Sequence, residues 1–396
     1  MKALLLENVH PEGVRLLTEA GFDVETHPEA LSEPELIGSL DGVTLLGIRS
    51  RTQVTPNVIA HAPESLLAIG AFCIGTNQVA LQAAGSRGIA VFNAPYSNTR
   101  SVVELVMAEI VAMARHLTDK NALMHAGQWD KSAKGAHEVR GRSLGIVGYG
   151  NIGSQLSVLA ESFGMHVMFY DVADKLALGN ARRVDNLDEL LDSVETVTLH
   201  VDGRPSNAGL FGADQFARMR DRALFLNLSR GFVVDTQALA DAIRSGHLAG
   251  AAIDVYETEP KGNGEQFTSP LQGLPNVILT PHIGGSTQEA QLDIGRYVAN
   301  KLIDYQQTGN TSMSVNLPEV QPDVQQGRRI VHIHRNVPGV MANINRVLGA
   351  HNANIAFQAL NTRGEIGYVV ADITEAVPGL VDELTAVPAT IRCRLL

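Results

Sequence analysis

The chain of 396 residues is 45% hydrophobic and 18% charged, which indicates a globular protein of two or three domains and excludes a disordered or fibrous chain. Its 31 basic and 42 acidic side chains give a net charge of −11, so we expect no nucleic-acid or membrane partner. With only Cys73 and Cys393, no apolar run long enough to span a membrane and no signal-peptide pattern, we expect a cytoplasmic protein without disulfides or a bound metal.

The first hundred residues alternate short apolar runs with helical patterns. The runs predict buried strands at residues 3–6, 43–48, 66–69 and 90–92. The patterns between them predict helices at residues 11–20, 34–40, 56–62 and 79–86. Continuous apolar strands separated by helices are typical of a parallel sheet that is covered on both faces.

A second alternating region follows a long predicted helix at residues 101–117. Its apolar runs predict strands at residues 144–147, 166–170, 196–200, 223–226, 251–253 and 277–279. Six such strands with helices between them fit one doubly wound sheet.

The end of the chain has a different pattern. Residues 308–327 are rich in Pro, Gly, Asn and Gln, which predicts a linker. The order predicted over residues 328–396 is strand, helix, strand, strand, helix, strand. This is the order of a small ferredoxin-like domain.

A glycine-rich turn follows the predicted strand at residues 144–147. In this GxGxxG pattern, Gly148 permits a tight turn, Gly150 leaves room for a pyrophosphate, and Gly153 lets the next helix pack closely. Asp171 ends the next strand, where a carboxylate accepts hydrogen bonds from ribose hydroxyls and repels a 2′-phosphate. The pattern predicts an NAD site; the alternative is a structural turn with a solvated aspartate.

Arg230, Glu259 and His282 follow three successive predicted strands of the same sheet. Open parallel sheets place ligands beyond the carboxyl ends of their strands. Hydride chemistry on a hydroxy acid needs a cation for the carboxylate and carbonyl oxygen, an imidazole for the proton, and a carboxylate that orients the imidazole. The alternative is that Arg230 and Glu259 are ordinary loop charges and that His282 is a capping or turn residue.

Three segments of this region resemble the D-isomer-specific 2-hydroxyacid dehydrogenases: Ser-Arg-Gly at 229–231, Ala-Gly-Ala-Ala-Ile-Asp-Val-Tyr-Glu-Thr-Glu-Pro at 249–260, and Thr-Pro-His-Ile-Gly-Gly-Ser-Thr at 280–287. The resemblance covers nearly the whole chain and implies that Arg230, Glu259 and His282 are the catalytic residues. It implies NAD as the cofactor, with the contacts Gly148, Gly150, Asn151, Ile152, Gly153, Asp171, Leu228, Ser229, Arg230, Asp254, His282, Ile283, Gly284 and Gly285.

The same resemblance implies an α/β fold with an inserted domain. A Rossmann NAD-binding domain, residues 98–283, would interrupt a flavodoxin-like substrate-binding domain made of residues 1–97 and 284–315. Residues 316–327 would form a linker, and residues 328–396 an α+β ferredoxin-like ACT regulatory domain.

Within the family, residues 75–77, 93–101 and 284–290 resemble the enzymes that act on D-3-phosphoglycerate. This implies NAD-dependent oxidation to 3-phosphohydroxypyruvate, the first step of L-serine biosynthesis, with feedback inhibition by L-serine. The family also allows reduction of 2-oxoglutarate to 2-hydroxyglutarate. The alternatives are a hydroxypyruvate or glyoxylate reductase and an NADH-sensing scaffold, because the fold also serves as a transcriptional corepressor.

Arg49, Ser50 and Arg51 follow the predicted strand at residues 43–48. Two guanidinium groups beside a hydroxyl provide forked, charged hydrogen bonds to a phosphate or carboxylate, although solvated loop arginines are the simpler interpretation of this motif alone. The family pattern favours a phosphate site and implies Asn98 as a further contact.

The tail resembles an ACT domain, a small-molecule sensor that pairs edge to edge with a second copy. The resemblance implies an L-serine site formed by His334 and Asn336, with Asn354 from a partner chain. Exposed sheet edges favour a partner, so we expect a homo-oligomer, specifically a homotetramer. The alternative is a dimerisation module that binds no ligand.

One position in the expected cofactor site departs from the family pattern. Asp202 stands where the family commonly has proline, after the strand that ends at His200. Its negative charge would lie near the nicotinamide, so we expect it to alter the affinity for NAD.

Overall fold

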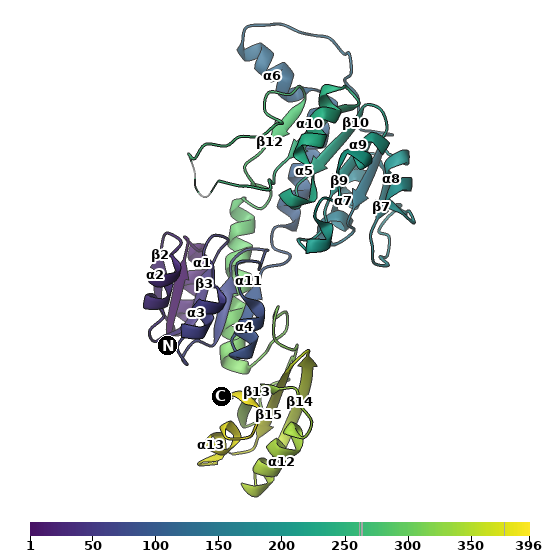
Figure 1. Ribbon diagram of the computed structural model, residues 1–396. Coiled ribbons are helices and arrows are strands. Elements are labelled where there is room, and N and C mark those ends of the chain that lie inside the picture. The colour runs from purple at the N-terminus through teal and green to yellow at the C-terminus, as the bar shows by residue number, and fades with distance from the viewer. Residues whose placement is uncertain (261, 263, 376) are drawn as a thin grey trace. The chain divides into compact units, whose positions relative to one another are not determined.

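The computed structural model describes residues 1–260, 262, 264–375 and 377–396. The chain divides into two compact units, one made of Met1–Ser97 and Gln291–Leu396 and the other of Asn98–Ala290 (Figure 1). The chain therefore leaves the first unit after residue 97 and returns to it at residue 291. Among these residues, no helix is both long enough and apolar enough to cross a membrane.

The first unit contains a five-stranded parallel sheet in the order β2-β1-β3-β4-β5. Its strands are β1 (Lys2–Leu6), β2 (Asp23–His27), β3 (Val43–Ile48), β4 (Ala68–Ala71) and β5 (Ala90–Asn93). Its helices are α1 (Pro11–Glu19), α2 (Glu33–Ser39), α3 (Pro56–His61), α4 (Leu81–Ser86) and most of α11 (Gln288–Thr308). Successive side chains of β1 enter opposite cores: Ala3 and Leu5 pack with Val298 of α11, and Leu4 and Leu6 lie in the other core. The parallel sheet covered on both faces is confirmed.

The second unit is built on a seven-stranded parallel sheet in the order β12-β11-β10-β9-β6-β7-β8. Its strands are β6 (Ser143–Val147), β7 (His166–Tyr170), β8 (Arg182–Arg183), β9 (Thr196–Leu199), β10 (Ala223–Asn227), β11 (Leu248–Ile253) and β12 (Val277–Leu279). Its helices are α5 (Thr99–Ala114), α6 (Leu117–His125), α7 (Asn151–Ser162), α8 (Leu187–Ser193), α9 (Ala213–Arg218) and α10 (Thr236–Arg244). The six predicted strands are confirmed. Chain order reverses at β6, which lies between β9 and β7, and ligands of open α/β sheets bind at such a point.

The prediction of one long helix at residues 101–117 is wrong in one respect, because the structure has two helices in this region. Helix α5 ends at Ala114 and α6 begins at Leu117, since His116 between them has a left-handed backbone with φ 50°. Helix α5 is largely buried, whereas α6 has no buried residue. A change of direction at a single residue leaves little trace in a helical pattern.

The chain ends in an antiparallel sheet in the order β14-β15-β13-β16, which confirms the ferredoxin-like order. Its elements are β13 (Arg328–Arg335), α12 (Val340–Ala350), β14 (Ile355–Arg363), β15 (Ile366–Ile373), α13 (Leu380–Thr385) and β16 (Thr390–Leu395). Helices α12 and α13 pack on one face. On the other face, Val331 and Tyr368 share a core with Phe92 and Tyr305.

The segment expected to be a linker, residues 308–327, is packed against the first sheet in its first half. The side chain of Asn316 accepts a hydrogen bond from Val91 N at 2.8 Å and donates one to Ile89 O at 2.9 Å. These bonds tie the segment to the backbone of β5. Residues 321–327 are mostly exposed.

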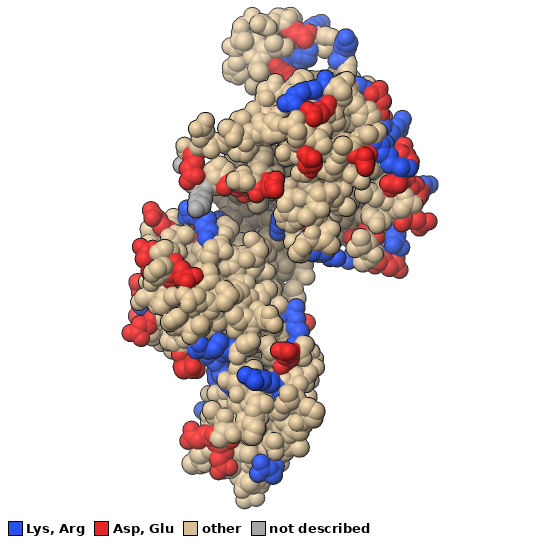
Figure 2. Space-filling model, in the orientation of Figure 1, with Lys and Arg blue, Asp and Glu red and all other residues tan. Residues whose placement is uncertain are grey.

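Charged side chains of both signs are interspersed over the face that Figure 2 shows. Among the residues drawn in colour there, the Lys and Arg side chains form no continuous basic surface. This distribution agrees with the net charge of −11.

Candidate functional site

The glycine loop after β6 has the geometry that a bound pyrophosphate requires. Gly148 has φ 92°, and a Cβ added there would lie 2.6 Å from the His200 carbonyl oxygen. A Cβ on Gly153 would lie 2.3 Å from the Gly148 carbonyl oxygen, so α7 packs this closely only with glycine. A Cβ on Gly150 would meet no described atom within 4 Å, which leaves space at the start of α7. The loop therefore fits the pyrophosphate of NAD.

Asp171 follows β7, the strand next to the glycine loop. Its Oδ2 accepts a hydrogen bond from Tyr149 N at 2.7 Å, and its Oδ1 accepts one from Ala173 N at 2.8 Å. These bonds hold the carboxylate at the edge of the sheet where the ribose of a dinucleotide binds. The position and charge of Asp171 fit NAD.

Asp202 does not present the free negative charge that the sequence suggests. Arg204 Nε donates to its Oδ1 at 2.7 Å, Arg204 Nη2 donates to its Oδ2 at 2.5 Å, and Asn207 Nδ2 donates to Oδ1 at 3.0 Å. The hydrogen bond from Arg204 lowers the pKa of Asp202, so the carboxyl group is ionised. The positive charge of Arg204 compensates its negative charge. This pairing weakens the electrostatic reason to expect an altered affinity for NAD.

The loops after β11 and β12 bring Glu259 and His282 into contact. His282 Nδ1 lies 2.9 Å from Glu259 Oε2 and 3.1 Å from Oε1. Glu259 Oε1 also accepts a hydrogen bond from Tyr256 N at 3.1 Å, which orients the carboxylate. Because Nδ1 faces Glu259, Nε2 is the ring nitrogen left for a substrate.

The contact shifts the pKa of both groups. The hydrogen bond to Glu259 raises the pKa of His282 above its ordinary value, although burial opposes the change. Burial alone would raise the pKa of Glu259, but the hydrogen bond and charge of His282 lower it below its ordinary value. Glu259 is therefore ionised, and the imidazole accepts a proton more readily than a free histidine.

The turn that carries His282 is tied down by Asp254. This carboxylate follows β11, is 1% exposed, and accepts hydrogen bonds from Thr280 Oγ1 at 2.6 Å, Ile283 N at 2.8 Å and Gly284 N at 2.9 Å. The bonds lie on both sides of His282, whose own backbone is left-handed with φ 55°. Asp254 thus fixes an unusual backbone conformation in place.

Arg230 follows β10 in a turn built around Asn227. The side chain of Asn227 accepts from Ser229 N at 3.0 Å and donates to Arg230 O at 2.9 Å. A Cβ on Gly231 would lie 1.9 Å from the Tyr256 carbonyl carbon, so only glycine allows these two loops to approach. This approach explains the glycine of the Ser-Arg-Gly motif.

The charge of Arg230 affects the pKa of both Glu259 and His282. It contributes to the lowered pKa of Glu259 and opposes the raised pKa of His282. Arg230, Glu259 and His282 follow β10, β11 and β12, so a cation, a carboxylate and an imidazole lie at the carboxyl edge of the sheet that carries the glycine loop. Such a set can bind a carboxylate and move a hydroxyl proton.

Arg49, Ser50 and Arg51 lie after β3 in the first unit, on a loop that is organised by Glu7. This carboxylate is 3% exposed and accepts from Arg49 N at 3.2 Å, Arg51 N at 3.0 Å and Thr52 N at 2.8 Å. Burial alone would raise the pKa of Glu7, but hydrogen bonds from Thr52 and the loop backbone lower it. The sequence analysis missed Glu7; its only signal is a charged residue directly after a buried strand.

Two of the predicted substrate contacts, Arg49 and Asn98, belong to different units. Arg49 Nη2 donates to Gln291 Oε1 at 2.9 Å in the first unit, a partner that the sequence analysis also missed. Asn98 lies in the second unit, just before α5, and a Cβ on Gly285 would lie 2.6 Å from its Nδ2.

The three residues expected to bind an effector differ in exposure. His334 on β13 is buried, with its ring over Gly367 of β15, where a Cβ would lie 2.1 Å from Nε2. Asn336 is exposed and donates to Gly364 O at 3.2 Å, and Asn354, before β14, is also exposed. The asparagines are therefore accessible in this chain, and the histidine is not.

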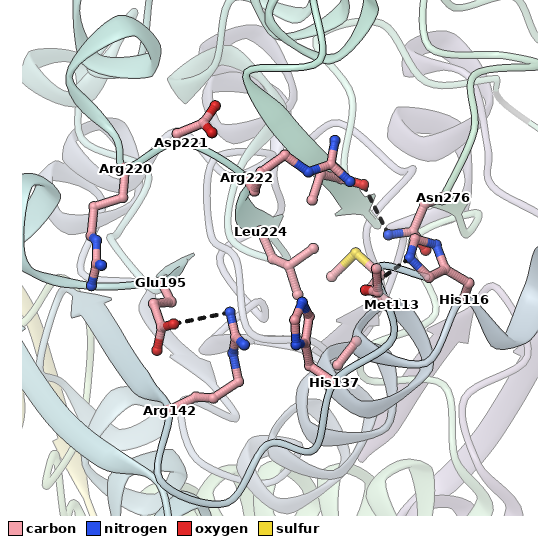
Figure 3. A pocket seen from close by; sticks show the side chains of 13 residues that line it. Met113, His116, His137, Arg142, Glu195, Arg220, Asp221, Arg222, Leu224 and Asn276 are labelled. Carbon is pink, nitrogen blue, oxygen red and sulfur yellow. Dashed lines mark hydrogen bonds and ion pairs between the residues drawn. The ribbon is translucent and has the colours of Figure 1, made fainter. Parts of the chain in front are cut away.

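A separate hollow of the second unit, drawn in Figure 3, lies at the opposite end of the sheet. Its lining includes Arg142 before β6 and Asn276 before β12. Arg142 Nη2 pairs with Glu195 Oε1 at 3.0 Å. Because Glu259 and His282 follow the carboxyl ends of the strands, this hollow is not part of the candidate site.

Two family profiles match the chain. The profile for the "D-isomer specific 2-hydroxyacid dehydrogenase, NAD binding domain" matches residues 107–284, which include the glycine loop and His282. The profile for the "AHAS small subunit-like ACT domain" matches residues 330–392. The NAD-binding and ACT-like character of these regions, expected from the sequence, is thereby confirmed.

Relatives extend the match over the whole chain. D-3-phosphoglycerate dehydrogenase of Escherichia coli (strain K12) is 50% identical over 400 residues, which cover 100% of this chain and 97% of that protein. D-3-phosphoglycerate dehydrogenase 1 of Saccharomyces cerevisiae is 49% identical over 413 residues, which cover 100% of this chain and 87% of that protein. The solved structure of the TT0316 protein from Thermus thermophilus matches with a TM-score of 0.70 and 30% identity, covering 77% of this chain and 97% of that one. The chain therefore belongs to the D-3-phosphoglycerate dehydrogenase family, within the D-isomer-specific 2-hydroxyacid dehydrogenases.

Proposed function

We propose that this chain oxidises D-3-phosphoglycerate to 3-phosphohydroxypyruvate with NAD, as the first step of L-serine biosynthesis. The observation that carries the proposal is the hydrogen-bonded pair of Glu259 and His282, with the charge of Arg230 acting on both, in the unit that holds the glycine loop. The names of relatives that are about half identical over the whole chain support the choice of substrate.

Each of the three side chains has a defined role in this reaction. When bound, NAD supplies the acceptor for the hydride that leaves C2 of the substrate. His282 takes the proton of the C2 hydroxyl at Nε2, because Nδ1 is engaged by Glu259. Glu259 stabilises the imidazolium that forms, and Arg230 holds the substrate carboxylate and stabilises the developing carbonyl oxygen.

We assign the phosphate of the substrate to Arg49, Ser50 and Arg51, with Asn98 as a further contact. The Glu7 carboxylate orders the loop mainly by accepting hydrogen bonds from the backbone N–H groups of the loop. The Arg51 side chain remains 49% exposed. Two guanidinium groups on an ordered loop suit a dianionic phosphate. The same cations would hold the second carboxylate of 2-oxoglutarate, which we propose as a substrate for reduction.

We further propose that L-serine is the effector and that the chain forms a homotetramer in the cytoplasm. The match of residues 330–392 to an ACT domain supports a sensor. Asn336 and Asn354 are exposed, as residues of a site shared with a second copy must be. Strand β14 ends the sheet of this chain, which leaves an edge for pairing. The chain has only two cysteines, Cys73 and Cys393, which suits a reducing compartment.

The variant His282→Ala tests the assignment of the proton carrier. We expect kcat for D-3-phosphoglycerate to fall by roughly 10²–10⁴-fold, the usual contribution of general acid–base catalysis, while NADH still binds with unchanged affinity. A variant that retains more than about a tenth of the wild-type kcat would show that His282 does not carry the proton.

A further inference from the structure

Gln78 is a buried amide that the proposed mechanism does not use. It lies between β4 and α4, is 3% exposed, and its Nε2 donates to Arg49 O at 2.8 Å. The same nitrogen donates to Cys73 Sγ at 3.2 Å and to Gly75 O at 3.3 Å. Hydrogen bonds of this kind hold buried side-chain amides in place. Gln78 therefore connects the loop after β3, residues 49–52, with the loop after β4, residues 73–77.

The loop after β4 is itself anchored to the next strand of the sheet. Asn93, the last residue of β5, donates from Nδ2 to Ile74 O at 2.5 Å, and Ala94 N donates to Cys73 O at 3.0 Å. Strands β3, β4 and β5 are neighbours in this order. The Gln78 side chain therefore attaches the 49–52 loop to a support that is fixed on the sheet.

The backbone around Gln78 makes a second connection to the chain that follows β3. Val54 N donates to Gln78 O at 2.8 Å, and Ala80 N donates to Val54 O at 2.9 Å. These two bonds hold the chain just after the 49–52 loop, whereas the side chain of Gln78 reaches the beginning of the loop at Arg49. One short segment, residues 78–80, thus holds the loop from both ends.

Arg49 is held on both sides of its backbone. Its N–H group donates to Glu7 Oε1 at 3.2 Å, and its carbonyl oxygen accepts the hydrogen bond from Gln78. Fixing both groups fixes the direction in which the Arg49 side chain leaves the backbone. A guanidinium binds a phosphate through forked, directional hydrogen bonds, so its strength as a ligand depends on how it is presented. Glu7 and Gln78 therefore act together on the residue that carries the first guanidinium of the loop.

We propose that Gln78 is a positioning residue that sets the selectivity for phosphorylated substrates, because it holds the backbone of Arg49 and joins the 49–52 loop to the anchored loop after β4. Gln78 acts through Arg49 and does not contact the reacting atoms. The inference deepens the proposed function and rests on its assignment of the substrate phosphate to Arg49, Ser50 and Arg51. A substrate without a phosphate does not use these guanidinium groups, so its binding should depend little on Gln78.

The test compares the reduction of 3-phosphohydroxypyruvate and of hydroxypyruvate by NADH in the wild type, Gln78→Met and Gln53→Met. Methionine is flexible, has a similar length and carries no N–H group, so Gln78→Met removes the hydrogen bonds and still fills the space. We expect KM for 3-phosphohydroxypyruvate to rise at least about tenfold, the equivalent of one charged hydrogen bond to the phosphate, while kcat changes less than about threefold. The KM values for hydroxypyruvate and NADH should remain near those of the wild type.

Gln53→Met is the matched control. Gln53 follows the same loop, and its Nε2 donates to a loop carbonyl, Arg51 O, at 3.3 Å. This side chain is exposed, so water replaces the hydrogen bond when it is lost. Both substrates should therefore have the wild-type KM in this variant.

Amide hydrogen exchange provides a readout that does not depend on the substrate. The N–H groups of Arg49, Arg51 and Thr52 donate to Glu7, so they exchange with solvent when the loop opens. In Gln78→Met, these groups should exchange about tenfold faster than in the wild type, the equivalent of one lost hydrogen bond. Their exchange in Gln53→Met should not change. If Gln78→Met does not fold, Gln78→Leu removes the same N–H groups and takes its place.

Three results would overturn the proposal. The first is a wild-type selectivity between the two substrates in an active Gln78→Met or Gln78→Leu enzyme, and the second is unchanged exchange in the 49–52 loop. The third is a fall in kcat by the same factor for both substrates with unchanged KM, which would show a purely structural role. Failure of the proposed function looks different, because the wild type itself would then show no preference for the phosphorylated substrate.

Discussion

The hydrogen bond with Glu259 sets the direction in which the pKa of the His282 imidazole shifts. Glu259 faces His282 Nδ1 at 2.9 Å and raises the pKa of the imidazole. The charge of Arg230 has the opposite effect on His282. Glu259 therefore makes the imidazole a stronger base, and Arg230 limits this rise in its pKa.

The variant Glu259→Gln should move the acid limb of D-3-phosphoglycerate oxidation to lower pH. Losing the carboxylate removes the effect that raises the pKa of His282, so the imidazole stays neutral to a lower pH. The kcat should also fall, because the imidazolium formed during the reaction loses its stabilising charge. An acid limb that stays in place or moves to higher pH would show that another group sets it.

The sequence predicts those residues of the candidate site that follow predicted strands. Arg230, Glu259 and His282 have this signal, and the glycines have a spacing with a steric reason. Glu7 lacks such a signal, because its importance comes from burial and from loop residues distant from it in the sequence. No local pattern separates a buried carboxyl group from an exposed one.

At the scale of elements, the loops after the strands carry the candidate site residues, and three of these loops are each ordered by one buried polar residue. Asp254 orders the turn after β12, Asn227 the turn after β10, and Glu7 the loop after β3. The strands hold these loops at one edge of each sheet. Loss of such a residue should therefore disturb one loop and leave the sheet intact.

Arg49→Ala should raise KM for D-3-phosphoglycerate by the equivalent of about 1.5–3 kcal/mol, since a charged hydrogen bond to the phosphate is lost. Glu7→Gln should raise the same KM, because the 49–52 loop loses its anchor, with little change in kcat. The affinity for NADH should not change in either variant. An unchanged KM in both variants would place the phosphate elsewhere.

The elements that the sequence does not predict have physical reasons. Strand β2 is polar and mostly exposed at a sheet edge, so it has no apolar run. Strand β8 has two residues, too few for any pattern. Helix α6 has no buried residue, and its start depends on the backbone of His116 alone. By contrast, every predicted strand with a continuous apolar run is found.

At the scale of the whole molecule, a buried ion pair joins the tail sheet to the segments that lead into it. Arg329 of β13 donates to both carboxylate oxygens of Asp372 on β15, at 2.6 and 2.8 Å. The same guanidinium donates to Thr308 O at 3.1 Å and Asp323 O at 2.8 Å. The end of α11, the exposed segment after it and two tail strands thus meet at one side chain.

Arg329→Ala should destabilise the protein strongly, by about 3–5 kcal/mol, because it leaves Asp372 buried without its partner. Arg328→Ala is the control, since this neighbouring side chain is exposed. Thermal unfolding of both variants checks the expectation. A Tm of Arg329→Ala equal to that of Arg328→Ala would contradict the role of the ion pair.

L-serine should inhibit the wild type, and excess substrate should not relieve the inhibition, because the effector binds in the tail. Asn336→Ala and Asn354→Ala should keep the basal activity and lose the response. A shared site couples ligand binding to the arrangement of two chains, because serine favours one arrangement. Dose–response curves, with Arg346→Ala on α12 as the control, check this. Full inhibition of both asparagine variants would place the serine site elsewhere.

The overall organisation was predictable only in part from local patterns. The two parallel sheets and the tail sheet follow from apolar periodicity, but the return of the chain at residue 291 does not. That return depends on which sheet α11 covers, and this is decided by long-range packing, in which Val298 and Leu302 of α11 lie close to Gly70 of β4. The family resemblance implies a return near residue 284, which periodicity does not predict.

Steady-state reduction of 3-phosphohydroxypyruvate with NADH, compared with hydroxypyruvate and glyoxylate under the same conditions, tests the central claim most directly. The account predicts robust turnover of the phosphorylated substrate and a kcat/KM for it that exceeds those of the other two by at least about tenfold, the equivalent of one charged hydrogen bond to the phosphate. An absence of turnover would favour an NADH-binding scaffold, and equal or higher kcat/KM for hydroxypyruvate or glyoxylate would identify a reductase without a phosphate site. Either result would contradict the account.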